Sequence, residues 1–127
     1  MIGIGSDLVD VDRFREVLAR TPTIVDRLFT TDEQAYARAR NDPTERFAAR
    51  FAAKEAAMKA MGVGLGAVGF LEIEVVRAES GAPSLVLHDQ AAELARSLGV
   101  HRWLITISHT DHVAQAIAVA LGDRGDS

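Results

Sequence analysis

The stretch FAAKEAAMKAMG, from Phe51 to Gly62, decides the fold of this chain. Alanine and methionine favour helix, and together with phenylalanine they are typical of a helix that packs against a core. Toward the N-terminus the helical pattern reaches Asp42-Pro43, an aspartate suited to the N-cap and a proline suited to the first helical position. The helix would run to Met61 and stop at Gly62, and its length of roughly 28 Å would make it the longest in the chain.

Apolar periodicity on either side of this helix predicts the remaining elements. Helical spacing, with a capping box formed by Thr30 and Glu33, predicts three further helices: Asp12–Arg20, Glu33–Arg40 and Asp89–Leu98. Apolar alternation and short apolar runs predict five strands: Ile2–Ser6, Phe70–Ala78, Ser84–Leu87, Trp103–Ser108 and Val113–Ala120. Because the later strands group in hairpins, we expect one α+β domain over residues 1–127, with a largely antiparallel sheet packed on the long helix.

Composition and charge exclude several classes of protein. The chain has 127 residues, a net charge of −4 and no cysteine, which excludes disulfides, thiolate metal sites and a cysteine nucleophile. The net acidic charge argues against a nucleic-acid partner. Ten of the fourteen lysines and arginines lie between Arg13 and Lys59, so a local basic face could bind phosphate or an acidic partner. No signal-peptide pattern and no apolar run near the ~20 residues of a membrane span is present, so we expect a cytoplasmic protein.

The opening GIGSDLVDVD places an aspartate beside glycines. It is neither a dinucleotide fingerprint, because Leu8 stands at the third glycine position, nor an EF-hand loop, because the required glycine and glutamate are absent. Asp7 would lie where a short glycine-containing strand ends. It is either a turn or N-cap aspartate, or a carboxylate beside bare backbone where a cation and a phosphate could approach closely.

The long helix offers a second carboxylate, Glu55. Glu55 and Lys59 are four residues apart in the favourable order, so a surface ion pair worth about 0.3–0.5 kcal/mol is one interpretation. However, Glu55 shares a face with apolar residues, and Arg50 and Lys54 form a basic row beside it. A carboxylate flanked by three cations suits a site for Mg²⁺ and a diphosphate, with Asp7 as the second carboxylate.

Ser108-His109-Thr110 closes the last predicted hairpin. Adjacent strand residues point to opposite faces, so Ser108 and His109 do not form part of a catalytic triad. His109 is either a solvated turn histidine or a phosphate donor or proton carrier at the edge of the sheet.

Three blocks carry a resemblance to a known family. They are GIGSDLVDVDRF at residues 3–14, RFAAKEAAMKAMGVG at residues 50–64 and ITISHTDHVAQAIAVA at residues 105–120. In their order and spacing the chain resembles the holo-acyl-carrier-protein synthases, the small bacterial type of phosphopantetheinyl transferase. The resemblance spans essentially the whole chain, and the K-E-A-x-x-K-A-x-G pattern of the middle block is its most specific part.

The resemblance implies an enzyme that moves the 4′-phosphopantetheine group of coenzyme A to a serine of apo acyl carrier protein and releases 3′,5′-ADP. It implies that Asp7 and Glu55 bind Mg²⁺ and that Lys59 lies near the transferred phosphoryl group. It also implies a homotrimer with active sites at the subunit interfaces. We expect Glu55 to accept the serine proton, directly or through a metal-bound water, in a phosphoryl transfer that Mg²⁺ and lysine stabilise.

Two further sets of residues complete the expected site. The coenzyme A site is expected to include Arg50, Lys54, Lys59, Gly62, Gly64, Ser108 and His109. The acidic carrier is expected to dock on Arg13, with Arg20 and Arg27 as companions. The alternatives are a non-catalytic module that binds coenzyme A or a nucleotide and docks an acidic protein, and, third, a Mg²⁺-dependent nucleotide hydrolase.

Overall fold

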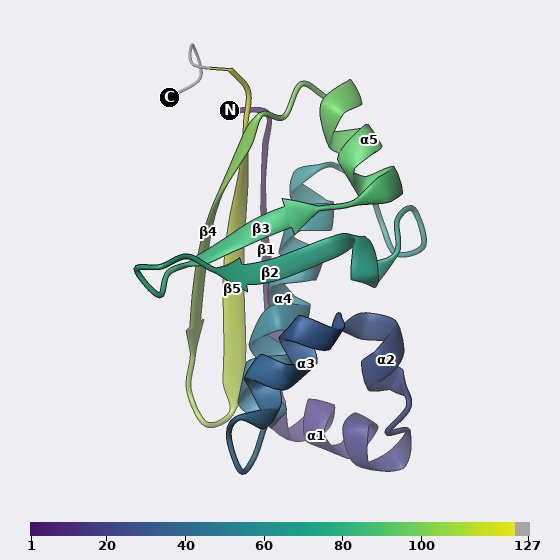
Figure 1. The fold of residues 1–127 in the computed structure, drawn as a ribbon, viewed down its shortest axis with the longest axis vertical. Helices are drawn as coiled ribbons and strands as arrows, with labels where there is room; N and C mark the ends of the chain where they lie inside the picture. Colours follow the sequence, from purple (N-terminus) through teal and green to yellow (C-terminus); the bar gives the residue numbers. More distant parts are fainter. Residues whose placement is uncertain (124–127) are drawn as a thin grey trace.

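The predicted long helix is present as α4 (Thr44–Ala60), which lies along one face of a three-stranded antiparallel sheet (Figure 1). The computed structural model describes residues 1–123, and the sheet has the strand order β1-β5-β4. These strands are β1 (Gly3–Asp10), β5 (Val113–Leu121) and β4 (Arg102–His109). The expected α+β class is confirmed, and residues 124–127 of the predicted domain lie outside the described part of the chain.

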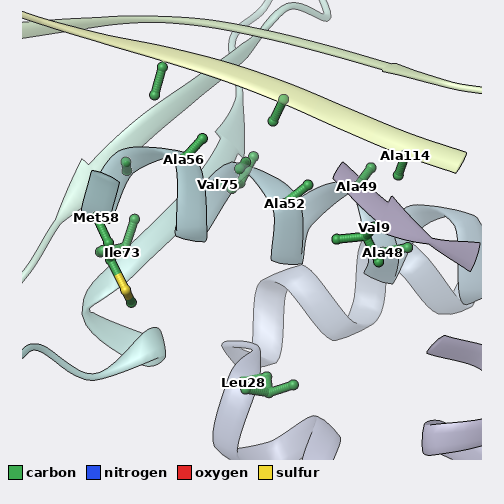
Figure 2. Close-up of a cluster of buried hydrophobic side chains, with 14 of the residues drawn as sticks. Val9, Leu28, Ala48, Ala49, Ala52, Ala56, Met58, Ile73, Val75 and Ala114 are labelled. Atoms are coloured by element: carbon green, nitrogen blue, oxygen red, sulfur yellow. The ribbon is translucent and has the colours of Figure 1, made fainter. Parts of the chain in front are cut away.

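Small residues allow α4 to lie very close to the sheet. The alanines of β5 that face the helix, at positions 114, 116, 118 and 120, are fully buried. Ala52 and Ala56 of α4 point toward this strand (Figure 2). In β1, a Cβ added at Gly3 would lie 1.9 Å from the Ala60 carbonyl oxygen, and one added at Gly5 would lie 2.1 Å from the Ala56 carbonyl oxygen. Only glycine therefore permits this packing distance.

The first strand is longer than predicted, and this changes the setting of Asp7. The prediction ended the strand at Ser6, but β1 pairs with β5 through Asp10, and Asp7 lies opposite Ala116. The prediction that Asp7 stands at the end of the strand is therefore wrong. The alternation of Ile and Gly stops at Ser6, but β5 offers a full-length partner, and pairing with that strand sets the boundary.

Three helices cover one end of α4 (Figure 1). The helices α1 (Val11–Arg20) and α3 (Thr31–Arg38) agree with the predicted elements, and the Thr30–Glu33 capping box is confirmed. The helix α2 (Ile24–Leu28) was not predicted, because five residues are too few for a helical period to be visible. The N-cap of α4 is Pro43 rather than Asp42, although the Asp42 carboxylate still accepts a hydrogen bond from the Thr44 N–H at 3.1 Å.

The remaining strands form a separate antiparallel hairpin. It joins β2 (Ile73–Arg77) to β3 (Pro83–Leu87), so the chain has two antiparallel sheets in its described part. The predicted strand from Phe70 begins instead with a 3-10 turn, η1 (Phe70–Glu72). The Glu72 carboxylate causes this turn by accepting hydrogen bonds from the N–H groups of Gly69 and Ala91. The helix α5 (Asp89–Ser97) follows the hairpin as predicted.

Among residues 1–123, none of the helices combines the length and the apolar character that crossing a membrane requires.

Candidate active site

Strand β1 and helix α4 bring together three of the predicted site residues. The Lys59 ammonium donates hydrogen bonds to Asp7 Oδ1 at 2.8 Å and to the Ser6 carbonyl oxygen at 3.0 Å. Glu55, one helical turn before Lys59, lies close enough to the Asp7 carboxylate for the two acidic groups to interact. The Asp7 side chain is only 13% exposed, whereas that of Lys59 is 53% exposed. Of these two side chains, the lysine is the one that solvent reaches.

Asp7 and Glu55 are two negative charges close together, and Lys59 is the cation beside them. Burial raises the pKa of the Glu55 carboxyl, and the negative charge of Asp7 raises it further, while the Lys59 ammonium opposes both. The hydrogen bond to Asp7 raises the pKa of the Lys59 ammonium. In the described residues Lys59 forms its ion pair with Asp7, so the surface ion pair with Glu55 that helical spacing suggested is not formed.

The donor set fits Mg²⁺. Two adjacent carboxylates supply the hard oxygen ligands that this ion prefers, and Glu55 carries an elevated pKa that a cation would relieve. Within residues 1–123 no cluster of three or more histidine, aspartate or glutamate side chains could enclose a metal alone. An ion at Asp7 and Glu55 would therefore take further ligands from water and from substrate oxygens, which is the usual arrangement for Mg²⁺ bound to phosphates.

An open apolar cavity of about 610 Å³ adjoins the carboxylates. Asp7, Glu55 and Arg13 contribute polar groups to its lining, and the rest is mostly apolar, including Phe14 and Phe51. Ile24 and Leu28 of the unpredicted helix α2 complete the wall. Arg20 and Arg27 are exposed on α1 and α2 but do not line this cavity.

A second, basic cavity of about 220 Å³ lies on another side of α4. Arg50 and His109 line it, and so do Arg40, Arg46 and Tyr36, which the sequence interpretation left out. The guanidinium carbons of Arg46 and Arg50 lie 4.1 and 4.0 Å from the centre of the Tyr36 ring.

The Arg50 guanidinium is held away from water. Burial lowers its pKa, and its Nε has no hydrogen-bond partner. Nothing in the local pattern of residues 36–46 indicated that these side chains would converge, because Tyr36 comes from α3, Arg40 from the connection and Arg46 from α4.

The remaining predicted residues are placed in different surroundings. Gly62 ends α4 with φ 74°, and Gly64 lines a small cavity of about 110 Å³ beside Glu55 and Lys59. Ser108 is exposed on β4 and lines none of these cavities. Lys54 is not at the site at all: its ammonium is completely buried against Glu33, 2.7 Å from Oε1. The basic row of Arg50 and Lys54 expected on the helix surface is therefore absent.

Comparison with known proteins places this chain in a family. Residues 3–120 match the model of the 4′-phosphopantetheinyl transferase superfamily. The chain is 42% identical over 119 residues to a holo-[acyl-carrier-protein] synthase of Moorella thermoacetica, which covers 94% of this chain and 93% of the relative. The chain belongs to the 4′-phosphopantetheinyl transferase superfamily, so the resemblance drawn from the sequence is confirmed.

Solved structures agree with this assignment. The crystal structure of the holo-acyl-carrier-protein synthase of Plasmodium yoelii superposes with a TM-score of 0.86, at 28% identity, over 98% of this chain and 97% of that one. A holo-(acyl-carrier-protein) synthase of Bacillus anthracis, solved in complex with coenzyme A (3′,5′-ADP), gives a TM-score of 0.77 at 34% identity, with 94% and 95% of the two chains covered.

Proposed function

We propose that this chain transfers the 4′-phosphopantetheine group of coenzyme A to a serine of an apo acyl carrier protein, with Mg²⁺, and releases 3′,5′-ADP. The observation that carries the proposal is the group of Asp7, Glu55 and Lys59, in which two carboxylates line an open cavity and an exposed ammonium binds one of them. Membership of the superfamily supports the reaction class.

Asp7 and Glu55 would hold the Mg²⁺ ion, which when bound stabilises negative charge on the pyrophosphate oxygens of coenzyme A. Lys59 would then leave Asp7 and donate to an oxygen of the transferred phosphoryl group. Its exposed side chain leaves it free to make this move. A cation that meets charge as it develops contributes most in the transition state.

Glu55 is the proposed proton acceptor. The serine oxygen attacks the β-phosphorus as its proton passes to Glu55, and the bond from phosphorus to the 3′,5′-ADP oxygen breaks, so the leaving group departs with the electron pair. The position of Glu55 in the lining of the open cavity supports this role, because a general base must lie within reach of the proton that it accepts.

The basic cavity is the proposed site for the 3′,5′-ADP phosphates. Arg46, Arg50 and His109 gather positive or protonatable groups there, and the unpaired Nε of Arg50 is a buried donor. Arg50 and Glu55 are five residues apart on α4, which turns their side chains about 140° from each other around the helix axis. We propose that a complete site therefore combines the carboxylates of one chain with the basic cavity of its neighbour.

The outer face of the sheet supports the expected homotrimer. It faces away from α4 and exposes large apolar side chains, among them Ile4 and Leu8 of β1, Leu104 of β4 and Val113 of β5. Leu8 is 67% exposed and Ile4 is 60% exposed. The register places polar residues such as Ser6, Thr106 and Gln115 on the same face. Exposed apolar side chains gathered on one sheet face are typical of a surface that is covered in an assembly.

The carrier is proposed to dock at the apolar cavity, with its acidic surface on Arg13 and, more distantly, on Arg20 and Arg27. Arg13 stands at the rim of the cavity beside Phe14, so one charged and one apolar contact are available side by side. A cytoplasmic location remains a prediction.

Intact mass of an apo acyl carrier protein incubated with the chain, coenzyme A and Mg²⁺ tests the proposal. We expect a gain of one phosphopantetheine that is lost with EDTA and in Asp7→Ala and Glu55→Ala. Coenzyme A binding without a mass change on several active carriers would instead favour the non-catalytic binding module. Release of a nucleotide product without any carrier would favour the hydrolase.

A further inference from the structure

Lys54 and Glu33 form an ion pair in the interior of the protein. The Lys54 ammonium lies 2.7 Å from Glu33 Oε1, and both side chains are 0% exposed. Burial lowers the pKa of Lys54, with Glu33 opposing the change. Because removing two charges from water is costly, and apolar residues of similar volume can often replace such a pair, its presence calls for a reason other than stability.

The pair connects separate parts of the chain. The second Glu33 oxygen, Oε2, accepts a hydrogen bond from the Val75 N–H of β2 at 2.8 Å, and Oε1 also accepts from the Thr30 N–H at 2.8 Å. Lys54 donates in addition to the Phe70 carbonyl oxygen at 2.8 Å. One buried ammonium therefore holds α4 to the first turn of η1.

Phe70 is the end of a glycine-rich segment that borders the active site. Gly62, Gly64, Gly66 and Gly69 lie in the segment between α4 and η1, and its residue Leu65 lines the cavity that contains Asp7 and Glu55. The Phe70 ring lines the same cavity and stacks on Phe51, with 5.3 Å between ring centres. A segment so rich in glycine has little intrinsic preference for one conformation, so its two ends decide where it lies.

Lys54 is placed to hold one of these ends. It precedes Glu55 in the sequence and lies on a different face of the same helix, so α4 presents Glu55 to the cavity and Lys54 to the Phe70 carbonyl at once. We propose that Lys54 is a positioning residue, which with Glu33 fixes the glycine-rich segment against Glu55 and so determines how coenzyme A lies at the carboxylates. This proposal rests on the proposed function.

The test separates the bond to Phe70 from the ion pair. Glu33→Gln removes the charge partner but leaves Lys54 to donate to the Phe70 carbonyl. The double variant Glu33→Gln with Lys54→Met also lacks that donor and leaves no unpaired charge. The two differ only at Lys54, so the first is the matched control for the second. Two quantities are measured for each variant: the hydrogen-exchange rates of the amides in residues 62–69, and the KM and kcat of the transfer reaction.

We expect exchange in this segment to become about tenfold faster in the double variant than in Glu33→Gln, with exchange in β1 and β5 unchanged. We expect KM for coenzyme A to rise about tenfold while kcat falls less. Lys54→Gln keeps a shorter neutral donor, so its exchange rate and its KM should lie between those of Glu33→Gln and those of the double variant. Equal exchange and equal KM in the control and the double variant would overturn the proposal. Loss of cooperative folding in every Lys54 variant would also overturn it, since the lysine would then serve the whole fold.

The exchange measurement needs no turnover. Suppose that the wild-type chain shows no transfer activity, and that the segment still exchanges faster without Lys54. The proposed function would then be wrong, but the anchoring of the segment by Lys54 would be supported.

Discussion

The Lys59 ammonium donates to the Asp7 carboxylate at 2.8 Å, although the two residues are 52 positions apart in the chain. The contact depends on the close approach of β1 to α4. Gly3 and Gly5 face carbonyl oxygens of the helix, and any residue with a Cβ at these two positions would force the strand and the helix apart. The chemistry at Asp7 therefore depends on glycines that carry no functional group.

Substitution of Gly5 should separate the strand from the helix. The Cβ of Gly5→Ala would lie 2.1 Å from the Ala56 carbonyl oxygen and 2.7 Å from the Ala60 nitrogen, so β1 must shift. We expect a loss of stability of about 1–3 kcal/mol in urea unfolding, with a larger loss of transfer activity. Gly64→Ala, where an added Cβ meets nothing within 4 Å, is the control and should leave stability nearly unchanged. Equal stability of Gly5→Ala and the wild type would contradict this account of the interface.

Removal of the Lys59 ammonium should affect the reaction more than the fold. The side chain is half exposed, so Lys59→Met should unfold at nearly the wild-type urea concentration. We expect kcat to fall by about 10²–10³-fold, as when one donor to a developing charge is removed. Arg96→Met, which changes an exposed cation remote from the carboxylates, is the control. A lysine that only neutralised Asp7 would leave kcat within a few-fold of the wild type.

The raised pKa of Glu55 predicts a pH-dependent cost of stability in the absence of Mg²⁺. The folded-state pKa of Glu55 lies above its ordinary value of 4.5, so the folded chain favours the protonated carboxyl. The stability that goes with this preference is fully present below pH 4.5 and is lost as pH rises through the folded-state pKa, where Glu55 ionises. Glu55→Gln should therefore be more stable than the wild type at neutral pH and equally stable near pH 4. Urea unfolding at both pH values measures this difference, and a Gln variant that was less stable at neutral pH would contradict the sign.

Mg²⁺ should reverse this effect, because a cation at Asp7 and Glu55 favours their ionised forms. We expect millimolar Mg²⁺ to raise the melting temperature of the wild-type chain, and EDTA to abolish the rise. Asp7→Asn and Glu55→Gln should each lose most of the response. A response that persisted in both variants would place the ion elsewhere.

The apolar outer face of the sheet predicts the assembly. Leu104→Glu places a charge on that face, away from the cavities, and should convert a trimer into monomers in light scattering, with loss of transfer. Leu71→Glu changes an apolar residue that is also exposed but lies outside the sheet, and it should leave the assembly intact. A wild-type chain that was monomeric at micromolar concentration would contradict the shared-site proposal.

Several features of the fold follow from local patterns. The approximate extent of α4, the hairpins and the Thr30–Glu33 capping box were predictable because helical period, turn residues and caps act over a few positions. Local patterns failed where a distant partner decided the outcome: β5 extended β1 past Asp7, and Glu72 turned the chain before β2 through its bonds to Gly69 and Ala91.

The candidate site divides in the same way. The sequence predicted Asp7, Glu55 and Lys59 as site residues, because two carboxylates and a lysine beside glycines are a chemical pattern that blocks of a few residues carry, and the structure places the three side chains together. Only the tertiary structure decided which lysine lies at the two carboxylates. Lys54 and Lys59 look alike on a helix of this composition, but Glu33 and the Phe70 carbonyl bury the first, and Asp7 draws the second toward the cavity. Helical spacing gives the direction in which a side chain points, whereas its burial and partners depend on what packs against that face.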